Sequence, residues 1–295
     1  MRVMSWNLQT FFDAEFDGNE YSEYKTAKYG WSEEKYAARL DRLVSVIKEL
    51  DADIVVMEEL EKEAQLQDIA NRLSGTFYLS KTYRYASFTK ENGSSIGCAV
   101  LSRIPIESVT VHSIDIRTSQ TQPALRPITS VLLTKDGTPL VLLINHWKSK
   151  SGDAERSEIW RQWQELVLTR LMKKAKGKNR AVIAAGDFNK DISEFTKHMS
   201  SDGTTNIILK GEENLAVYSP WISENGEYSE NGSYWYKNEW ERIDQFFVAG
   251  NAKITDFCAE STGDWAYEDG HPRRYQLWNG SGYSDHLPIT CTLHF

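Results

Sequence analysis

Carboxylate, amide and imidazole side chains border short apolar runs at six places in this sequence. These places are Ser5-Trp6-Asn7, Val56-Met57-Glu58-Glu59, Ile144-Asn145-His146-Trp147-Lys148-Ser149, Ala185-Gly186-Asp187-Phe188-Asn189, Arg242-Ile243-Asp244 and Ser284-Asp285-His286. Because an apolar strand that stops at a polar residue leaves that residue on the rim of a sheet, we expect these groups to face a ligand. Oxygen ligands with histidines suit Mg²⁺ or Mn²⁺ and the hydrolysis of phosphate esters.

Each of these segments also has an ordinary structural explanation when it is taken alone. Asn7 could be a turn residue, His146 a hydrogen-bonded structural histidine, and Glu59 a residue in the first turn of a helix. Gly186-Asp187-Phe188-Asn189 could be a simple Asx turn, in which a side-chain oxygen accepts a hydrogen bond from the backbone two residues on. The combination, and not any single member, indicates a functional site.

The elements that must position these residues are short strands that alternate with helical segments. Apolar runs predict strands at Arg2–Trp6, Asp53–Met57, Gly97–Ser102, Ile128–Thr134, Leu140–Asn145, Arg180–Ala185, Ile243–Val248 and Leu287–Leu293. Lys135-Asp136-Gly137-Thr138 separates two of these runs and predicts a tight hairpin, so at least one pair of strands is antiparallel.

Apolar residues at helical spacing predict two amphipathic helices. The first begins after Ser32 and has a stripe of Tyr36, Leu40, Leu43, Val44, Ile47 and Leu50. The second has a stripe of Ile159, Trp163, Leu166, Val167 and Leu171 and ends in a basic run over residues 173–178. We interpret that run as a solvated helix end rather than as a DNA-binding patch. Mixed strands flanked by helices indicate an α/β sandwich.

Composition excludes several classes of protein. The 295 residues include 34 Lys and Arg and 42 Asp and Glu, and this net charge of −8 excludes a histone-like binder but allows an enzyme with a bound divalent metal. No run approaches the roughly 20 apolar residues of a membrane span, so no integral membrane association is expected. Cys98, Cys258 and Cys291 lack the spacing of a zinc site. The chain starts at once with an apolar segment, so we expect a cytoplasmic protein, or an exported one if a leader has been removed.

Taken in order, the motifs Asn…Glu…Asn-x-His…Gly-Asp-Phe-Asn…Ile-Asp…Ser-Asp-His resemble the endonuclease/exonuclease/phosphatase family, which includes deoxyribonuclease I, exonuclease III and the abasic-site endonucleases. The resemblance runs from Asn7 to His286, and Gly97–Arg103 is similar to the family's central strand. It implies one domain over residues 1–295, built as a four-layer α/β/β/α sandwich of two mixed β-sheets flanked by helices. It also implies an active site at one edge, between the sheets.

The resemblance implies a metal side of this site. Glu59 is similar to the family's principal metal-binding glutamate, and Asn7 is similar to the first-strand asparagine that steadies metal and water. Asp285, in the closing motif, is also expected on the metal side. Glu58 stands where the family usually has Gln, so we expect it to support the site rather than to bind metal. The expected cofactor is Mg²⁺ or Mn²⁺.

The resemblance also implies catalytic roles. Asp187 and Asn189 match the pair that positions the attacking water and the phosphoryl oxygens, and His146 matches a histidine of the deoxyribonuclease-like members, expected to serve the leaving oxygen. Asp244 matches the aspartate that orients the closing histidine, His286. Since a nearby carboxylate raises the pKa of an imidazole, we expect His286 to be protonated and to stabilise charge on the phosphoryl group.

The class of substrate follows less directly from these motifs than the metal-binding and catalytic roles do. Arg126 resembles a phosphate-contacting arginine of the deoxyribonucleases, and Lys148 lies in a segment similar to that of the deoxyribonucleases and secreted nucleases. We therefore expect a monomeric, metal-dependent phosphodiesterase whose partner is DNA or RNA. One alternative is a same-fold phosphoesterase on a lipid or small phosphorylated substrate, such as a sphingomyelinase or a sugar-phosphate phosphatase. Another is a catalytically silent binding protein, which is disfavoured because no motif position is lost.

Five tryptophans fall late in the chain, and they leave two explanations open. They are Trp221, Trp235, Trp240, Trp265 and Trp278. Beside Arg273 and Arg274 they could stack on nucleobases or grip a head group. We favour the alternative that they pack long irregular loops.

Overall fold

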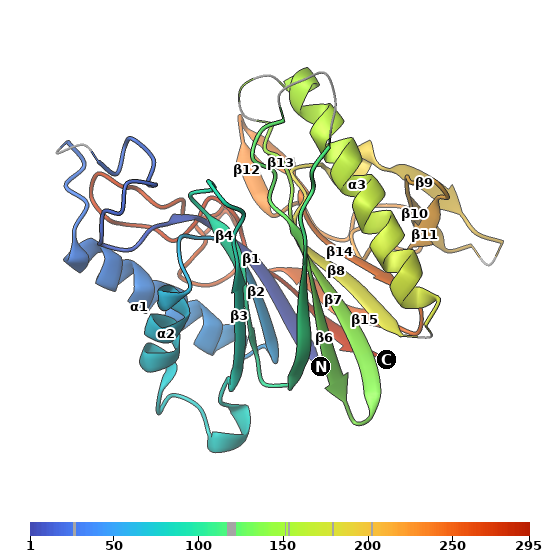
Figure 1. The fold of residues 1–295 in the computed structure, drawn as a ribbon, viewed down its shortest axis with the longest axis horizontal. Helices are drawn as coiled ribbons and strands as arrows, with labels where there is room; N and C mark the ends of the chain where they lie inside the picture. The colour runs from blue at the N-terminus through green and yellow to red at the C-terminus, as the bar shows by residue number, and fades with distance from the viewer. Residues whose placement is uncertain (26–27, 117–121, 151, 153, 179, 202) are drawn as a thin grey trace.

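Two β-sheets face each other at the centre of the molecule, and helices cover their outer faces (Figure 1). The computed structural model describes residues 1–25, 28–116, 122–150, 152, 154–178, 180–201 and 203–295. In order, the first sheet consists of β15 (Lys253–Ala259), β16 (Ile289–His294), β1 (Arg2–Phe11), β2 (Ile54–Leu60), β4 (Gly97–Ser102) and β3 (Tyr85–Thr89). The second sheet consists of β14 (Asp244–Ala249), β8 (Ala181–Asp187), β7 (Thr138–His146), β6 (Ile128–Lys135) and β5 (Ile106–His112).

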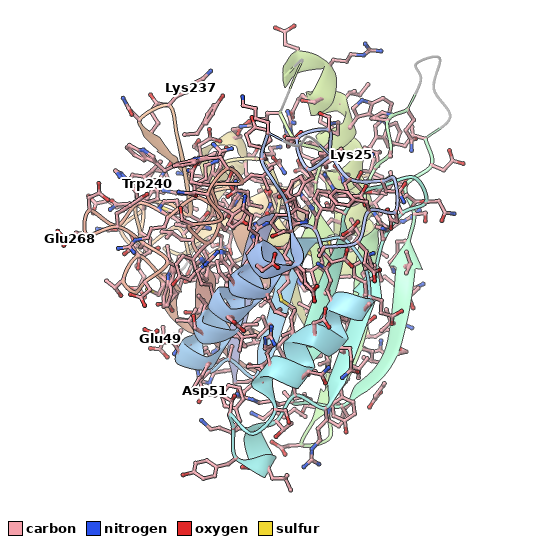
Figure 2. The ribbon with its side chains drawn as sticks, turned by 90° about the vertical axis from the view of Figure 1, so that its left-hand side faces the viewer. Lys25, Glu49, Asp51, Lys237, Trp240 and Glu268 are labelled. Atoms are coloured by element: carbon pink, nitrogen blue, oxygen red, sulfur yellow. The ribbon has the colours of Figure 1, made fainter. Side chains whose placement is uncertain are left out.

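Three helices complete the four layers. Helices α1 (Glu33–Leu50) and α2 (Ala64–Leu73) lie next to each other across the first sheet (Figure 2), and α3 (Ala154–Lys176) packs on β7 and β8 of the second. The expected α/β/β/α sandwich of two mixed sheets is confirmed, because each sheet contains both parallel and antiparallel pairs. No helix that the structure describes has the length and apolar character needed to cross a bilayer.

Smaller elements surround this sandwich. Strands β9 (Thr196–Met199), β10 (Thr205–Leu209) and β11 (Leu215–Val217) form a three-stranded sheet beside α3, and β12 (Tyr234–Tyr236) pairs with β13 (Glu239–Glu241) in a hairpin. Two short 3-10 helices, η1 (Leu79–Lys81) and η2 (Ile192–Glu194), occupy connections. Figure 1 places the β12–β13 hairpin near the ends of the central strands, at the edge opposite the chain termini.

All eight predicted strands are present, and Gly97–Ser102 is correct at both ends. They correspond to the buried strands β1, β2, β4, β6, β7, β8, β14 and β16. The strands that sequence reasoning missed include β5 and β15, whose residues are largely exposed and therefore lack a continuous apolar run. The predicted hairpin is also present: Lys135 pairs with Thr138, and Asp136 and Gly137 between them have φ values of 50° and 82°. Two such left-handed residues are what a type I′ turn requires.

Helix α1 matches its prediction, whereas α3 turns a different face inward. The Ser32 side chain accepts a hydrogen bond from the Lys35 backbone N–H, and the whole predicted stripe of α1 is buried. In α3 the predicted stripe is only partly buried, and all of its members except Leu166 pack against the core. The face that is fully buried contains Trp160, Arg161, Gln164, Glu165, Leu168, Thr169 and Met172.

The polar residues on the buried face of α3 explain this rotation, because each binds a segment that leads into or out of the second sheet. Arg161 donates to the Lys148 carbonyl (3.0 Å), and Gln164 accepts from the Lys148 backbone N–H (2.8 Å). Glu165 accepts from Lys190 Nζ (2.9 Å) and from a backbone N–H. A prediction from the spacing of apolar residues places such polar residues on the solvent side of the helix. Here they hold in place the two segments that follow β7 and β8.

The Glu165–Lys190 ion pair yields a prediction about stability. Both side chains are at least 94% buried, with exposures of 2% and 6%. Lys190→Ala leaves the Glu165 carboxylate buried without its counter-charge, so the free energy of unfolding should fall by about 3–5 kcal/mol. Urea unfolding followed by circular dichroism measures this change. Lys178→Ala, at an exposed position after α3, is the matched control, and an equal small loss in both variants would contradict the assigned role.

Candidate active site

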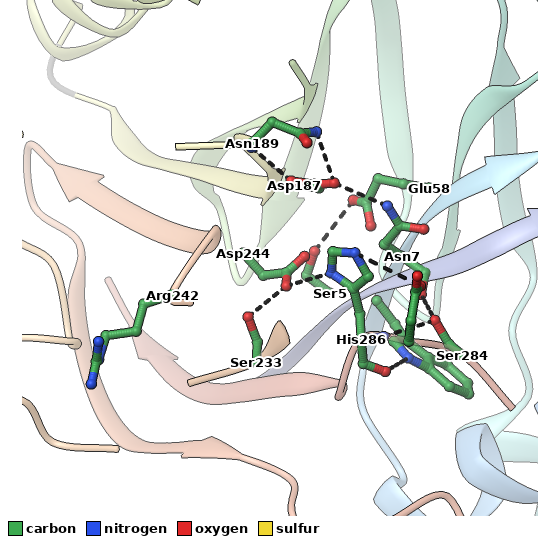
Figure 3. A network of polar contacts seen from close by, with 12 residues as sticks. Ser5, Asn7, Glu58, Asp187, Asn189, Ser233, Arg242, Asp244, Ser284 and His286 are labelled. Atoms are coloured by element: carbon green, nitrogen blue, oxygen red, sulfur yellow. Dashed lines mark hydrogen bonds and ion pairs between the residues drawn. The ribbon is translucent and has the colours of Figure 1, made fainter. Parts of the chain in front are cut away.

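Polar side chains from both sheets meet at the ends of their central strands (Figure 3). Three of them come from neighbouring strands of the second sheet in register: His146 on β7 pairs with Asp187 on β8, and Asp187 pairs with Asp244 on β14. Because residues paired across strands project from the same face of a sheet, these three side chains point together toward the first sheet. All three are buried, with exposures of 2%, 2% and 1%.

The first sheet contributes Asn7 from β1 and two glutamates from β2. Strand alternation places Asn7 and Glu58 on the face between the sheets, where both are buried, and would turn Glu59 toward the helices. The β1–β2 and β2–β4 pairings both shift register just here, and Glu59 has a φ of 71°. This bulge re-aims the Glu59 side chain, so that its carboxylate contacts Asn7 instead.

Asn7 joins the two sheets. Its Nδ2 donates to Glu59 Oε1 (3.2 Å) and to Asp187 Oδ2 (3.0 Å), while its Oδ1 accepts from the Gln9 backbone N–H (2.9 Å). The second Glu59 oxygen accepts from the Thr10 backbone N–H at 2.5 Å. Asn7 therefore fixes one carboxylate from each sheet in close proximity.

The Gly186-Asp187-Phe188-Asn189 segment does form the Asx turn that the sequence suggested, and it also presents its side chains to the site. Asp187 Oδ1 accepts from the Asn189 backbone N–H (2.7 Å), and Oδ2 accepts from Asn189 Nδ2 (3.0 Å). The glycine is required, because a Cβ at Gly186 would lie 1.9 Å from the Asn145 carbonyl oxygen and 3.0 Å from Glu58 Oε1.

Asp244 and His286 form the closest charged pair of the site. His286 Nδ1 lies 2.8 Å from Asp244 Oδ2, which also accepts from the Ser233 hydroxyl (2.6 Å). Burial alone would lower the pKa of His286, but the hydrogen-bonded Asp244 carboxylate outweighs it and raises this pKa well above its usual value of 6.5. The Trp6 indole donates to the His286 carbonyl (2.8 Å) and fixes the backbone below the ring.

His146 has the opposite electrostatic character. Its Nε2 lies 3.5 Å from Glu59 Oε1 and 3.7 Å from Asp187 Oδ2. Burial, together with the positive charges of Arg126 and His286, lowers the pKa of His146 well below 6.5. The site therefore holds a neutral imidazole beside a charged one at neutral pH.

The carboxyl groups of Glu58, Asp187 and Asp244 share one nearby positive charge, that of His286. Burial and the Asp244 charge raise the pKa of Asp187 to about 7, despite the opposing charge of His286. Burial and the neighbouring Asp244 and Asp187 also raise the pKa of Glu58 well above its usual range. Glu58 Oε2 and Asp244 Oδ1 are buried and have no hydrogen-bond partner among the described residues.

The other predicted residues lie around this centre. Arg126 donates to the Trp147 carbonyl (3.3 Å), and burial together with the charges of Arg126 and Arg161 lowers the pKa of Lys148. Asp285, which we expected on the metal side, instead lies 4.0 Å from His286 Nε2 and 3.8 Å from Arg274 Nη2. Its role as a metal ligand stays a prediction.

Sequence reasoning missed the part of the site that the β12–β13 hairpin supplies. Ser233 orients Asp244, and its carbonyl accepts from the Leu287 N–H (2.7 Å). The Tyr234 ring lies 4.6 Å from the His286 ring, centroid to centroid. Neither residue follows an apolar strand, so no sequence signal distinguished them.

The late tryptophans mostly pack loops, as favoured above. Trp221 and Trp265 are buried, and Trp235 and Trp240 lie against the ring of His271 with centroid distances of 3.9 and 5.1 Å. Trp278 differs, since it is 65% exposed.

Comparison with known proteins identifies the class. The profile of the Endonuclease/Exonuclease/phosphatase family matches residues 4–286. The chain therefore belongs to this family, whose fold is that of phosphoesterase and nuclease hydrolases. No curated protein sequence matches the chain significantly.

Several solved structures share the fold over the whole chain. C. elegans TDP2 has a TM-score of 0.64 at 15% identity, with 74% of its own chain covered. D. rerio TDP2, complexed with single-strand DNA product, has a TM-score of 0.62 at 18% identity and is 99% covered. The human Nocturnin catalytic domain with bound sulfate anion has a TM-score of 0.60 at 16% identity and is 94% covered. In each case 100% of the present chain is covered.

The Asp244–His286 pair yields a kinetic prediction. His286→Ala should lower turnover by at least about a hundredfold, the scale of a lost charge-stabilising group. Asp244→Asn should lower turnover through the same unit, so the double variant should be scarcely worse than the more damaging single one. Because the raised pKa keeps the imidazole protonated to higher pH, activity should fall as pH rises through it, and Asp244→Asn should move that fall to lower pH.

Turnover and melting temperature are measured on the same samples, with Glu239→Gln, at the exposed first residue of β13, as the control. If His286 only packs against the last strand, His286→Ala will melt earlier yet keep its turnover, and the catalytic assignment will be wrong.

Proposed function

We propose that this protein is a divalent-cation-dependent hydrolase that cleaves phosphodiester bonds in DNA or RNA. The observation that carries the proposal is the close approach of Glu59, Asp187 and neutral His146, beside the charged Asp244–His286 pair. A centre of this kind matches the two demands of phosphodiester hydrolysis: a place for a cation and a separate positive charge for the phosphoryl oxygens.

The donor set fits Mg²⁺ or Mn²⁺. Glu59 and Asp187 supply hard oxygen donors, and both accept hydrogen bonds from the amide group of Asn7. Burial raises the pKa of Asp187 although the charge of His286 opposes this, so a further positive charge would stabilise the carboxylate. We infer that Glu59 and Asp187 would hold the cation, with Asn7 positioning both carboxylates. Asp285 is a further candidate from the expected metal side. When bound, the cation would polarise a phosphoryl oxygen and ease deprotonation of water.

The remaining steps belong to the protein's own side chains. Asp187, whose Oδ2 accepts from both Asn7 and Asn189, would position the attacking water together with Asn189. His286, protonated at Nε2 and Nδ1, would stabilise the charge on the phosphoryl oxygens. His146 is neutral, so it would serve the leaving oxygen by donating a hydrogen bond rather than as an imidazolium.

Three features support a nucleic-acid substrate. D. rerio TDP2, which shares the fold, was solved with single-strand DNA product. The stacked rings of Tyr234 and Tyr236 (6.0 Å between centroids) lie beside His286, and Tyr236 is 45% exposed, so nucleobases could stack there. Arg126 and Lys148 place positive charge near His146 for a phosphate. We further propose that residues 1–295 form one domain that acts as a monomer.

A smaller phosphoester remains the alternative, and one observation favours it. Arg126 and Lys148 are each partly buried and lower the pKa of the same imidazole, so they serve one phosphate position rather than a long backbone track. With a net charge of −8, the chain as a whole repels a polyanion.

Metal dependence is the first test of the proposal. Cleavage of a nucleic-acid or dinucleotide diester should stop in EDTA and return with Mg²⁺ or Mn²⁺. Glu59→Gln should require at least about tenfold more metal for half-maximal rate, because it removes one anionic ligand. Glu49→Gln, at the exposed end of α1 in Figure 2, removes the same charge far from the site and should behave like the wild type. Full activity in chelator would overturn the mechanism.

Salt dependence separates the two substrate classes. If Arg126 and Lys148 contact a polyanion, the Michaelis constant on duplex DNA should rise with salt, and the slope should fall by about 0.9 in Lys148→Ala. Lys176→Ala, at the exposed end of α3, should leave the slope unchanged. The alternative of a small phosphoester substrate would be favoured if the Michaelis constant on duplex DNA is insensitive to salt and small esters are hydrolysed faster than DNA.

A further inference from the structure

A second group of carboxylates lies outside the active site, in the loop that follows β1. We call residues 12–25 the acidic loop, since it contains Asp13, Glu15, Asp17, Glu20 and Glu23. Single oxygens of Asp17, Glu20 and Glu61 lie within 4.8 Å of one another, and Glu61 directly follows β2. Two oxygens on opposite sides of a Ca²⁺ ion are about 4.8 Å apart, so all three oxygens can reach one ion.

Glu61 is the member of this group that points to a ligand. It is fully buried, at 0% exposure, and its carboxylate is directed into the cluster. Oε2 accepts from the Asp13 backbone N–H (2.8 Å), whereas Oε1 is buried without a hydrogen-bond partner in the described part of the chain. A buried carboxylate oxygen with no donor costs free energy unless a cation satisfies it.

The surrounding charges leave room for a divalent cation. Lys62 pairs with Asp13 (2.9 Å) and lies within 3.8 Å of Glu15 and Asp17, and Lys25 lies 3.8 Å from Glu20. Lys90 donates to the Glu61 carbonyl (2.7 Å). Five carboxylates, from Asp13, Glu15, Asp17, Glu20 and Glu61, therefore face three ammonium groups, which leaves a surplus of two negative charges.

We propose that Asp17, Glu20 and Glu61 form a second divalent-cation site, selective for Ca²⁺. The donors are oxygen only, and Glu20 is itself held by the backbone N–H groups of Asp17 (2.6 Å) and Gly18 (3.1 Å). Gly18, with a φ of 100°, lets the loop curl around its own carboxylates. A loop with adaptable geometry suits Ca²⁺, which accepts six to eight irregular oxygen ligands, better than Mg²⁺, which requires a near-octahedral shell.

The position of the site gives it a structural consequence. Glu61 lies two residues beyond Glu59, so a bound ion ties the acidic loop to the strand that carries the active-site carboxylate. The same loop carries Tyr24, whose hydroxyl donates to the Thr10 carbonyl (2.8 Å), and the Thr10 backbone N–H in turn donates to Glu59 Oε2 (2.5 Å). Ca²⁺ would therefore hold one wall of the active site in place without taking part in the chemistry.

Calcium titration of the purified chain tests the site, with heat of binding and melting temperature as readouts. Wild type should bind Ca²⁺ and melt at higher temperature as Ca²⁺ is added, and Glu59→Gln should keep this response. Asp17→Asn, which changes a side chain that is 41% exposed, should weaken Ca²⁺ binding by at least about tenfold. Glu61→Gln should do the same. Glu23→Gln, at an exposed position of the same loop, is the matched control and should bind as the wild type does.

The outcomes separate this site from the active site. Unchanged Ca²⁺ binding in Asp17→Asn, or loss of binding in Glu59→Gln alone, would overturn the second site. Loss of Ca²⁺ binding in Asp17→Asn but not in Glu23→Gln supports the second site, and this result does not depend on whether hydrolysis requires a metal.

Discussion

Buried carboxyl groups crowd the place where the two sheets meet, and the rest of the site is arranged around that constraint. Glu58, Asp187 and Asp244 are each at most 2% exposed, and Glu59 lies beside them. Ionised carboxylates at this depth are costly unless a positive charge is close. The protonated His286 provides one such charge beside Asp244. Burial, together with the remaining excess of negative charge, raises the pKa values of Asp187 and Glu58. The same excess makes a divalent cation a fitting partner.

Local backbone features make this crowding possible. The bulge at Glu59 and the left-handed turn at Asn189, with φ values of 71° and 46°, hold side chains that regular strands would direct elsewhere. Gly186 allows the Asn145 backbone and Glu58 to approach Asp187 closely. Behind them, the polar face of α3 binds the segments after β7 and β8. The strand ends that carry His146 and Asp187 are therefore supported by buried hydrogen bonds as well as by apolar packing.

The sequence predicted the central strands, because buried strands are continuous apolar runs, and the family resemblance implied the four-layer class. Polar residues that border these runs meet at one edge of the fold, and their roles stay predictions. It did not predict the buried polar face of α3, since Arg161, Gln164 and Glu165 are hydrophilic and only their tertiary partners draw them inside. The placement of Ser233 depends on a hairpin with no apolar signal. The direction of the Glu59 side chain depends on a β-bulge, which shifts the register of β2 against β4 and leaves no signal in the amino-acid composition. The contacts of Asp285 with Arg274 and His286 could likewise be read only from the fold.

The central claim is that Asp244 keeps His286 charged while His146, in the same site, stays neutral. Nitrogen NMR of the two imidazole rings in the metal-free protein measures this directly, with resonances assigned through His286→Ala and His146→Ala. At pH 7.5 the account predicts that both ring nitrogens of His286 carry protons and that His146 carries one, although an unperturbed histidine with a pKa of about 6.5 would be mostly neutral at this pH. A neutral His286 ring at pH 7.5, or a charged His146 ring, would contradict the account.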